Sequence, residues 1–184
     1  MTLFPFDEIN ALELQAEALK QPDTPPKKED VDKYIDEVTD LFVMAYVYGT
    51  MEVSAELGLG IVPDTEEARA VIDERFDGKD YKDRLNEYLY GGTAADINRV
   101  IDTDTHRIYN AAKFNGARQA GATMKTWNTM LDDRVRDTHE YLEGVTIPMD
   151  AEFYSFQGGK TLYPGQWGIP EEDCNCRCYL TFSK

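Results

Sequence analysis

Residues 125–182 read KTWNTMLDDRVRDTHEYLEGVTIPMDAEFYSFQGGKTLYPGQWGIPEEDCNCRCYLTF, and they carry most of the information about fold and function. This stretch contains both tryptophans, all three cysteines and one of the two histidines. Short apolar runs alternate in it with turns that contain glycine or proline, a pattern typical of strands. We expect strands at 124–129, 145–147, 152–156 and 176–182, with a short helix at 134–142.

The chain upstream of this stretch has the pattern of helices. Apolar residues recur there at spacings of three and four, which places them on one helix face. Capping residues and breaks at glycine or proline divide the pattern into segments. The expected helices are 6–20, 30–57 with Asp30 as its N-cap, 64–77 opened by an Asp64/Glu67 capping box, 79–90, and 93–121 opened by Thr93 and Asp96.

These patterns predict an α+β fold, with a helical N-terminal part followed by a small antiparallel, β-rich C-terminal module. We expect an acidic helical region at 1–92 and the module, preceded by its long helix, at 93–184. Pro22, Pro25 and Pro26 interrupt the chain after the first helix. Residues 1–28 can therefore form a hinged arm, and a helix packed back on the bundle is the alternative.

Charge is distributed unevenly along the chain. The net charge is −16, and residues 1–92 hold 22 acidic and 9 basic residues. Such a chain repels phosphate, so we expect only weak or indirect contact with DNA and either a basic protein partner or simple solubility. The longest apolar run, 41–48, is too short to span a bilayer, and no secretory signal is recognisable at the N-terminus. We therefore expect no membrane association.

The cysteines suggest a metal site. Cys174, Cys176 and Cys178 are spaced by two, so in a strand their thiols would share one face. Neighbours on one face stand nearly twice as far apart as the ~3.8 Å between Cβ atoms that a disulfide requires. Thiolates and imidazoles are, however, ordinary zinc ligands. The pattern predicts a zinc site of His139, Cys176 and Cys178, with Cys174 or Asp133 as the fourth ligand.

Other interpretations of these residues stay open. The thiols can be reduced and half-buried without a metal, or one thiol can pair with histidine as a nucleophile. A zinc-dependent hydrolase or nuclease would use Asp133 or Glu140 as its general base. Arg134 and Arg136 can clamp Asp133 or Asp150 in a structural network, or contact a partner or phosphate.

Several motifs in order resemble the phage Mu F-like head morphogenesis family. The matching residues are Trp127, Asp133-Arg134-Val135-Arg136, His139, Leu142-Glu-Gly144, Asp150, Phe153, Pro164-Gly165 and Asn175-Cys176-Arg177-Cys178. Thr103-Asp104 and Arg107 resemble the preceding T-E-x-x-R helix of the family, with Asp in place of Glu. Cys174 lies outside the family's N-C-R-C pattern.

The resemblance implies a structural role. It implies a minor capsid protein of the virion, located in the head interior or at the portal vertex and present in the host cytoplasm during assembly. Its partners would be the portal protein, the major capsid protein or both, and its roles would lie in head assembly and in DNA packaging or ejection. It does not imply an enzyme, although some members carry fused toxin or ADP-ribosyltransferase domains. A free-standing acidic interaction protein is a further alternative.

Overall fold

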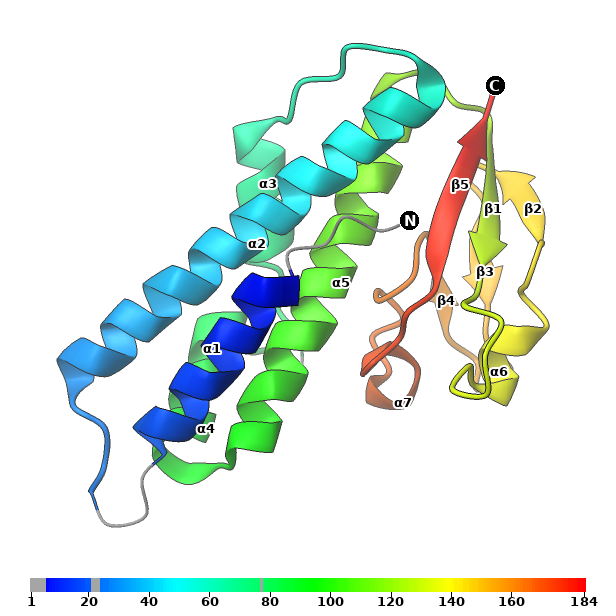
Figure 1. The fold of residues 1–184 in the computed structure, drawn as a ribbon. Helices are drawn as coiled ribbons and strands as arrows, with labels where there is room; N and C mark the ends of the chain where they lie inside the picture. The colour runs from blue at the N-terminus through cyan, green and yellow to red at the C-terminus, as the bar shows by residue number, and fades with distance from the viewer. Residues whose placement is uncertain (1–5, 21–23, 77) are drawn as a thin grey trace.

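The computed structural model describes residues 6–20, 24–76 and 78–184, with the backbone alone for residues 6–8. A group of helices lies beside a small sheet, and β5 runs along one side of α5 (Figure 1). The predicted α+β arrangement is confirmed. The elements are α1 (Phe6–Leu19), α2 (Lys28–Leu57), α3 (Thr65–Ile72), α4 (Tyr81–Gly91), α5 (Ala94–Gln119), β1 (Met124–Asn128), α6 (Asp137–Glu140), β2 (Thr146–Pro148), β3 (Phe153–Tyr154), β4 (Lys160–Thr161), α7 (Pro170–Asp173) and β5 (Tyr179–Ser183).

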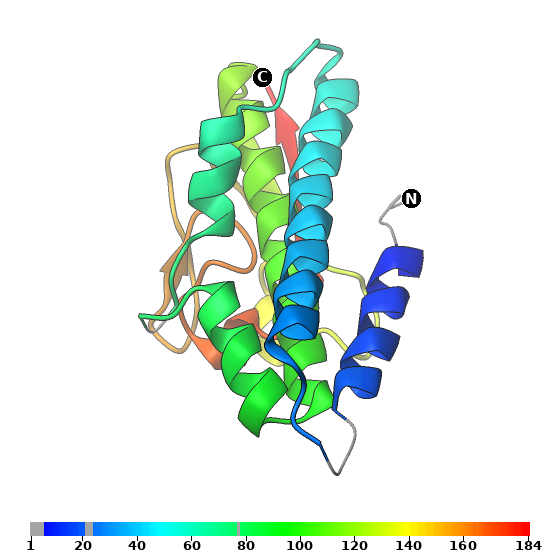
Figure 2. The same ribbon diagram turned by 90° about the vertical axis from the view of Figure 1, so that its left-hand side faces the viewer.

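Helices α2 and α5 form the central pair of the helical part. They lie side by side, and α1, α3 and α4 pack around them (Figures 1 and 2). The two helices approach each other closely at Gly49, where an added Cβ would lie 2.5 Å from the carbonyl oxygen of Tyr109. Thr93 and Asp96 form the predicted capping box at the start of α5, and left-handed Gly58 ends α2 as predicted.

Helix α1 packs on the bundle rather than extending from it. Leu12 and Ala16 are buried, and the hydroxyl of Tyr34 donates to the carbonyl of Leu12 at 3.2 Å. The ammonium of Lys20 donates to the carbonyl of Tyr88 at 3.1 Å. In the described residues of this segment, 6–20 and 24–28, the structure thus has the packed helix rather than a hinged arm. Of the interrupting prolines, Pro22 lies outside the described residues.

The largest differences from the predicted helices are at the start of α2, at the end of α3 and at α6. α2 starts after Lys27, which makes no side-chain cap, and Asp30 lies in its first turn, where its charge favours the helix dipole. α3 ends at Ile72 instead of 77. The guanidinium of Arg107 donates a hydrogen bond to the carbonyl of Val71 at 2.8 Å, so a side chain from α5 binds one of the free carbonyls at the end of α3. The helix expected at 134–142 is only the single turn α6.

The sheet is antiparallel, with strand order β2-β1-β5. Lys125 on β1 pairs with Ile147 on one side and with Phe182 on the other. β3 and β4 form a separate two-stranded hairpin. β5 begins at Tyr179 rather than at Cys176, so the segment 174–178 is not a strand, and the strand geometry expected for its thiols is wrong.

The buried apolar residues form two clusters that share α5. One lies among α1, α2, α3, α4 and α5 up to Ala112, and the other lies between the C-terminal part of α5, with Val53 of α2, and the module. α5 therefore connects the helical part to the module, while a domain boundary at 92/93 stays a prediction. None of the described helices combines the length and apolarity needed to cross a bilayer.

Candidate functional site

A buried histidine and two buried thiols meet at one point of the C-terminal module. His139 comes from α6, and Cys176 and Cys178 come from the irregular segment before β5. The Nδ1 atom of His139 lies 3.5 Å from Sγ of Cys178 and 3.7 Å from Sγ of Cys176. The structure thus brings together the three residues that the sequence predicts as metal ligands.

The other ring nitrogen of His139 faces a buried carboxylate. Nε2 lies 3.0 Å from Oε2 of Glu172 in α7, although without the alignment of a full hydrogen bond. Glu172 also accepts hydrogen bonds from Thr138 at 2.8 Å and from Ser155. Burial alone would raise the pKa of Glu172, but these two bonds and the neighbouring His139 outweigh it and lower the pKa. The negative charge favours the histidine tautomer with its proton on Nε2, which leaves the Nδ1 lone pair facing the sulfurs.

The two thiols differ in acidity. The interaction with Cys178 and then burial raise the pKa of Cys176. The pKa of Cys178 is lowered, first by the hydrogen bond from Cys176 and further by Trp127 and the charge of Arg136. Cys178 is therefore the sulfur of the pair that more readily becomes a thiolate.

Aromatic rings enclose the histidine. Trp127 on β1 contacts His139 edge-on, with ring centroids 5.7 Å apart, and Trp167 stacks on it at 6.0 Å. Trp127 also packs against Phe153, at 5.0 Å. Both tryptophans are buried, so the imidazole is held in one orientation by rings that exclude water.

One small opening reaches this cluster from solvent. It has a volume of about 10 Å³, enough for one water molecule. Its lining includes His139 and Cys178 together with Arg134, Arg136 and Arg177. The cluster is therefore buried but reachable from solvent, and three arginines are among the residues that line the opening.

Helix α5 holds the cysteine segment through its backbone. Nε2 of His106 donates to the carbonyl of Cys178 at 2.7 Å, and the amide of Asn110 donates to the same oxygen at 3.1 Å. The backbone N–H of Asn175 donates to the hydroxyl of Thr103 at 3.4 Å. Burial lowers the pKa of His106, against the opposing effect of its bond to the Cys178 carbonyl.

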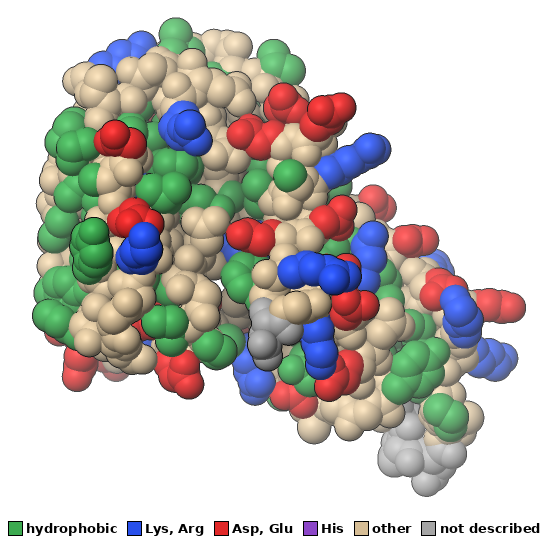
Figure 3. Space-filling view, turned by 180° about the vertical axis from the view of Figure 1, so that it is seen from behind, with side chains coloured by type: hydrophobic (Ala, Val, Ile, Leu, Met, Phe, Trp, Pro, Cys, Tyr) green, Lys and Arg blue, Asp and Glu red, His purple; other side chains and the backbone are tan. Residues whose placement is uncertain are grey.

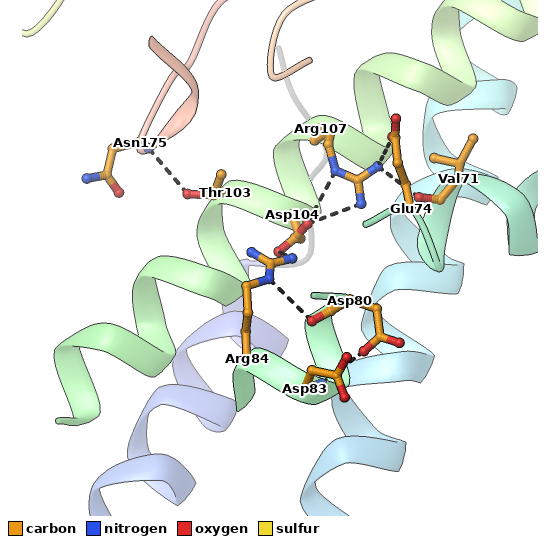
Figure 4. A network of polar contacts seen from close by, with 9 residues as sticks. All are labelled: Val71, Glu74, Asp80, Asp83, Arg84, Thr103, Asp104, Arg107 and Asn175. Atoms are coloured by element: carbon orange, nitrogen blue, oxygen red, sulfur yellow. Dashed lines mark hydrogen bonds and ion pairs between the residues drawn. The ribbon is translucent and has the colours of Figure 1, made fainter. Parts of the chain in front are cut away.

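A second polar network lies on the same helix, at Asp104 and Arg107, which directly follow Thr103 and His106 in the sequence (Figure 4). Buried Asp104 accepts hydrogen bonds from Arg107 at 3.1 Å and from Arg84 of α4 at 2.8 Å. Arg107 also pairs with Glu74 at 2.8 Å and binds the carbonyl of Val71. The network joins α3, α4 and α5, and it lines part of a surface hollow of about 840 Å³ that extends to α7.

The Pro164-Gly165 motif packs directly on this network. Gly165 has a φ of +88°, and an added Cβ would lie 3.1 Å from both Cα and Cβ of Arg107. Gly144, another predicted motif residue, has a φ of +72°, and its backbone N–H donates to the carbonyl of Trp127 at 2.9 Å. Both glycines therefore stand where the backbone turns or approaches another segment closely.

The predicted fourth ligands are not part of the cluster. The residues placed together are His139, Cys176 and Cys178, and within the described chain neither Cys174 nor Asp133 belongs to that group. Asn175 adopts a left-handed conformation with φ of 55°, so the backbone at 174–178 does not alternate as a strand would. Cys174 follows α7, and its carbonyl accepts from Arg136.

The clamp expected of Arg134 and Arg136 is absent from the described residues, and another arginine forms a bidentate pair nearby. In the part of the chain that the structure describes, neither Arg134 nor Arg136 forms an ion pair with Asp133 or Asp150. The bidentate pair is instead between Arg177 and Asp132, at 2.8 and 2.6 Å. It lies at the surface and ties the cysteine segment to the turn before α6.

The comparison with known proteins covers most of this region. The family description "Phage Mu protein F like protein" matches residues 69–181. The Minor head protein GP7 of Bacillus phage SPP1 is 39% identical over 83 residues, which are 44% of this chain and 27% of that protein. The NAD(+)--arginine ADP-ribosyltransferase EFV of Enterococcus faecalis (strain ATCC 700802 / V583) is 29% identical over 115 residues, which are 59% of this chain and 23% of that protein.

The matches cover much of this chain but only a small part of each relative. The chain spans about a quarter of the length of these two curated relatives. No solved structure matches it significantly. The family match covers well over half of the chain and includes α5, the sheet and the histidine–cysteine cluster. The chain therefore belongs to the phage Mu protein F-like family.

Proposed function

We propose that this protein is a minor head protein of a tailed phage or prophage, with a structural role at the portal vertex or inside the capsid. The observation that carries the proposal is the family match over residues 69–181, together with 39% identity to a minor head protein over 83 residues. Head assembly and DNA packaging or ejection are the processes in which it would take part, and the virion is its final location.

The contacts of the polar residues support a structural role. His106 and Asn110 bind a backbone carbonyl, and Arg107 binds another backbone carbonyl and two carboxylates. These side chains are occupied in joining segments of this chain. None of these three side chains is placed as the base of a nucleophile, a role that catalysis by these groups would require.

The metal-dependent hydrolase is supported less well. Its predicted general bases, Asp133 and Glu140, are exposed and do not belong to the histidine–cysteine group. The carboxylate that contacts the group is Glu172, which is buried on the Nε2 side of the histidine and away from the sulfurs. A general base must reach a water on the open side of a metal, and Glu172 does not lie there.

Charge favours protein partners over DNA. The net charge is −16, and charged side chains crowd the surface of the helical part (Figure 3). A protein of this charge gains no general attraction to phosphate, so contact with DNA would be indirect. The portal protein and the major capsid protein are the partners that we propose.

The test is co-purification of the full chain with the portal protein and, separately, with the major capsid protein of the same phage. Two exposed apolar positions supply matched variants. Phe156 is 76% exposed and lies within the family match, whereas Leu14 is 67% exposed and lies outside it. Exposed substitutions of this kind change stability by roughly 0.5 kcal/mol or less.

Binding of either partner by the wild type and by Leu14→Glu, with weaker binding by Phe156→Glu, would support a docking role for the matched segment. Recovery of neither partner, and absence of the chain from purified heads, would reject the proposal. The chain would then be a free-standing acidic interaction protein. Binding that is lost in Leu14→Glu alone would place the contact in the helical part instead.

A further inference from the structure

We infer that His139, Cys176 and Cys178 bind one zinc ion through three protein ligands, with a fourth coordination position that opens to solvent. The inference concerns a binding site and is independent of the proposed place of the protein in the phage head. It rests on the separation of the three ligand atoms, the surroundings of the histidine and the shape of the opening.

The separations fit a tetrahedral ion. With Zn–S near 2.3 Å and Zn–N near 2.0–2.1 Å, two ligand atoms on one tetrahedral edge stand about 3.6 Å apart for sulfur and nitrogen. The two sulfur–nitrogen distances to Nδ1 of His139 are 3.5 and 3.7 Å, and all three ligand atoms lie within 4.8 Å of one another. An ion can therefore be placed between them with little movement of the side chains.

The histidine is oriented as a ligand. Its Nδ1 faces both sulfurs, while Nε2 faces the carboxylate of Glu172 at 3.0 Å. Metal-binding histidines ordinarily contact a carboxylate or carbonyl through the nitrogen that does not bind the metal. Ser155 and Thr138 hold Glu172 in turn, so the ligand has the second layer of support that metal sites usually have.

The fourth position is the feature that the sequence does not predict. Neither Cys174 nor Asp133 belongs to the group of ligand atoms within the described residues. The opening beside His139 and Cys178 has room for one water molecule. Three protein ligands plus water form a complete tetrahedral set, and the arginines at the entrance would favour a small anion in its place.

The ion would connect parts of the module that are distant in the sequence. It would tie the turn α6 to the segment before β5, whose Cys178 carbonyl is held by His106 and Asn110 of α5. Loss of the ion should loosen this segment first, because β1 and β5 retain their own ladder. Zinc would therefore link α6 to the segment before β5, and its fourth coordination position would stay accessible to solvent.

The experiment measures metal on the purified, reduced full chain. Zinc content per chain is determined by elemental analysis, and cobalt(II) replaces zinc for absorption spectroscopy. We expect one zinc per chain, a thiolate-to-cobalt charge-transfer band and the strong visible bands of a tetrahedral site. His139→Ala and Cys178→Ser should lose the zinc, and Cys174→Ser should keep it. Glu172→Gln should weaken binding by roughly 10- to 100-fold.

The wild type alone can overturn the inference. Reduced wild-type chain that takes up neither zinc nor cobalt would show that the thiols pair only with the imidazole. This result does not depend on whether the variants fold. Loss of zinc in Cys174→Ser, with the fold retained by circular dichroism, would instead show a closed four-ligand site and refute the open position. None of these results bears on the proposed function in the phage head, which the co-purification experiment tests separately.

Discussion

Replacing Arg107 by methionine should destabilise the protein strongly, because it removes the centre of a buried network. Asp104 and Arg107 are each only 1% exposed, and Arg107 also pairs with Glu74 and binds the carbonyl of Val71 (Figure 4). The substitution leaves Asp104 buried with Arg84 as its remaining partner. Breaking a buried pair on one side costs about 3–5 kcal/mol, and the lost bond to the Val71 carbonyl is included in that range.

The control is a similar pair at the surface. Arg99 and Asp96 form an ion pair on α5 with 49% and 26% exposed side chains, where removal should cost about 0.2–1 kcal/mol. Urea unfolding followed by circular dichroism gives the free energy of each variant. In the double variant Asp104→Leu/Arg107→Met the buried charge is gone, so we expect it to be more stable than Arg107→Met by at least about 1 kcal/mol. The reasoning would be refuted if Arg107→Met cost no more than Arg99→Met, or if the double variant were the less stable one.

Three other substitutions test close packing and a buried charge. Gly49→Ala should cost about 1–3 kcal/mol in urea unfolding, because its Cβ would lie 2.5 Å from a carbonyl of α5, whereas Gly91→Ala, with no atom within 4 Å, should be neutral or stabilising. Gly165→Ala should lower the free energy of unfolding by about 2–4 kcal/mol, more than Gly168→Ala does. Both glycines have positive φ, but only Gly165 packs closely against Arg107 of α5. Equal costs for the two substitutions would contradict this packing. Burial lowers the pKa of Lys125 to about 8. Above that pH the unfolded chain therefore binds more protons than the folded chain, so the free energy of unfolding rises with pH. Relative to Lys125→Met, the free energy of unfolding of the wild type should rise by about 2 kcal/mol between pH 7.5 and 9.5. A difference that stays constant with pH would contradict a lowered lysine pKa.

The helical part was predictable from local signals. The capping box at Thr93 and Asp96 and the left-handed Gly58 mark helix ends through contacts within a few residues, and the structure has both. The end of α3 was not predictable in this way. It depends on Arg107, which donates a hydrogen bond to the carbonyl of Val71 although the two residues are 36 positions apart in the sequence. Contacts between residues so far apart produce no periodic pattern in the sequence that could predict them.

His139, Cys176 and Cys178 lie together as the sequence predicts, although the local geometry expected for them is wrong, and their binding of a metal stays a proposal. A strand at 176–182 would have aligned all three thiols, but the strand starts at Tyr179 and Asn175 adopts positive φ. This turn of the backbone separates Cys174 from the two later cysteines. His139, Cys176 and Cys178 were grouped because imidazole and thiolates are common zinc ligands, and spacing alone could not place Cys174 or Asp133 relative to them.

Glu172 was missed because nothing in its local sequence distinguishes it. It lies among acidic residues in the short helix α7, where Glu171 is exposed and Glu172 is fully buried. The proline at 170 can start a helix, and a helix of this length has no periodicity to show which side is inward. Only the packing of α7 against the module brings the carboxylate to His139.

The assembly of His139, Cys176 and Cys178 around one ion is tested most directly by anomalous diffraction at the zinc absorption edge from crystals of the reduced full chain. A single peak within bonding distance of Nδ1 of His139 and of both sulfurs, with density for one non-protein ligand toward the opening, is the predicted result. An absence of anomalous signal at that position, or a fourth protein ligand bound to the ion, would contradict it.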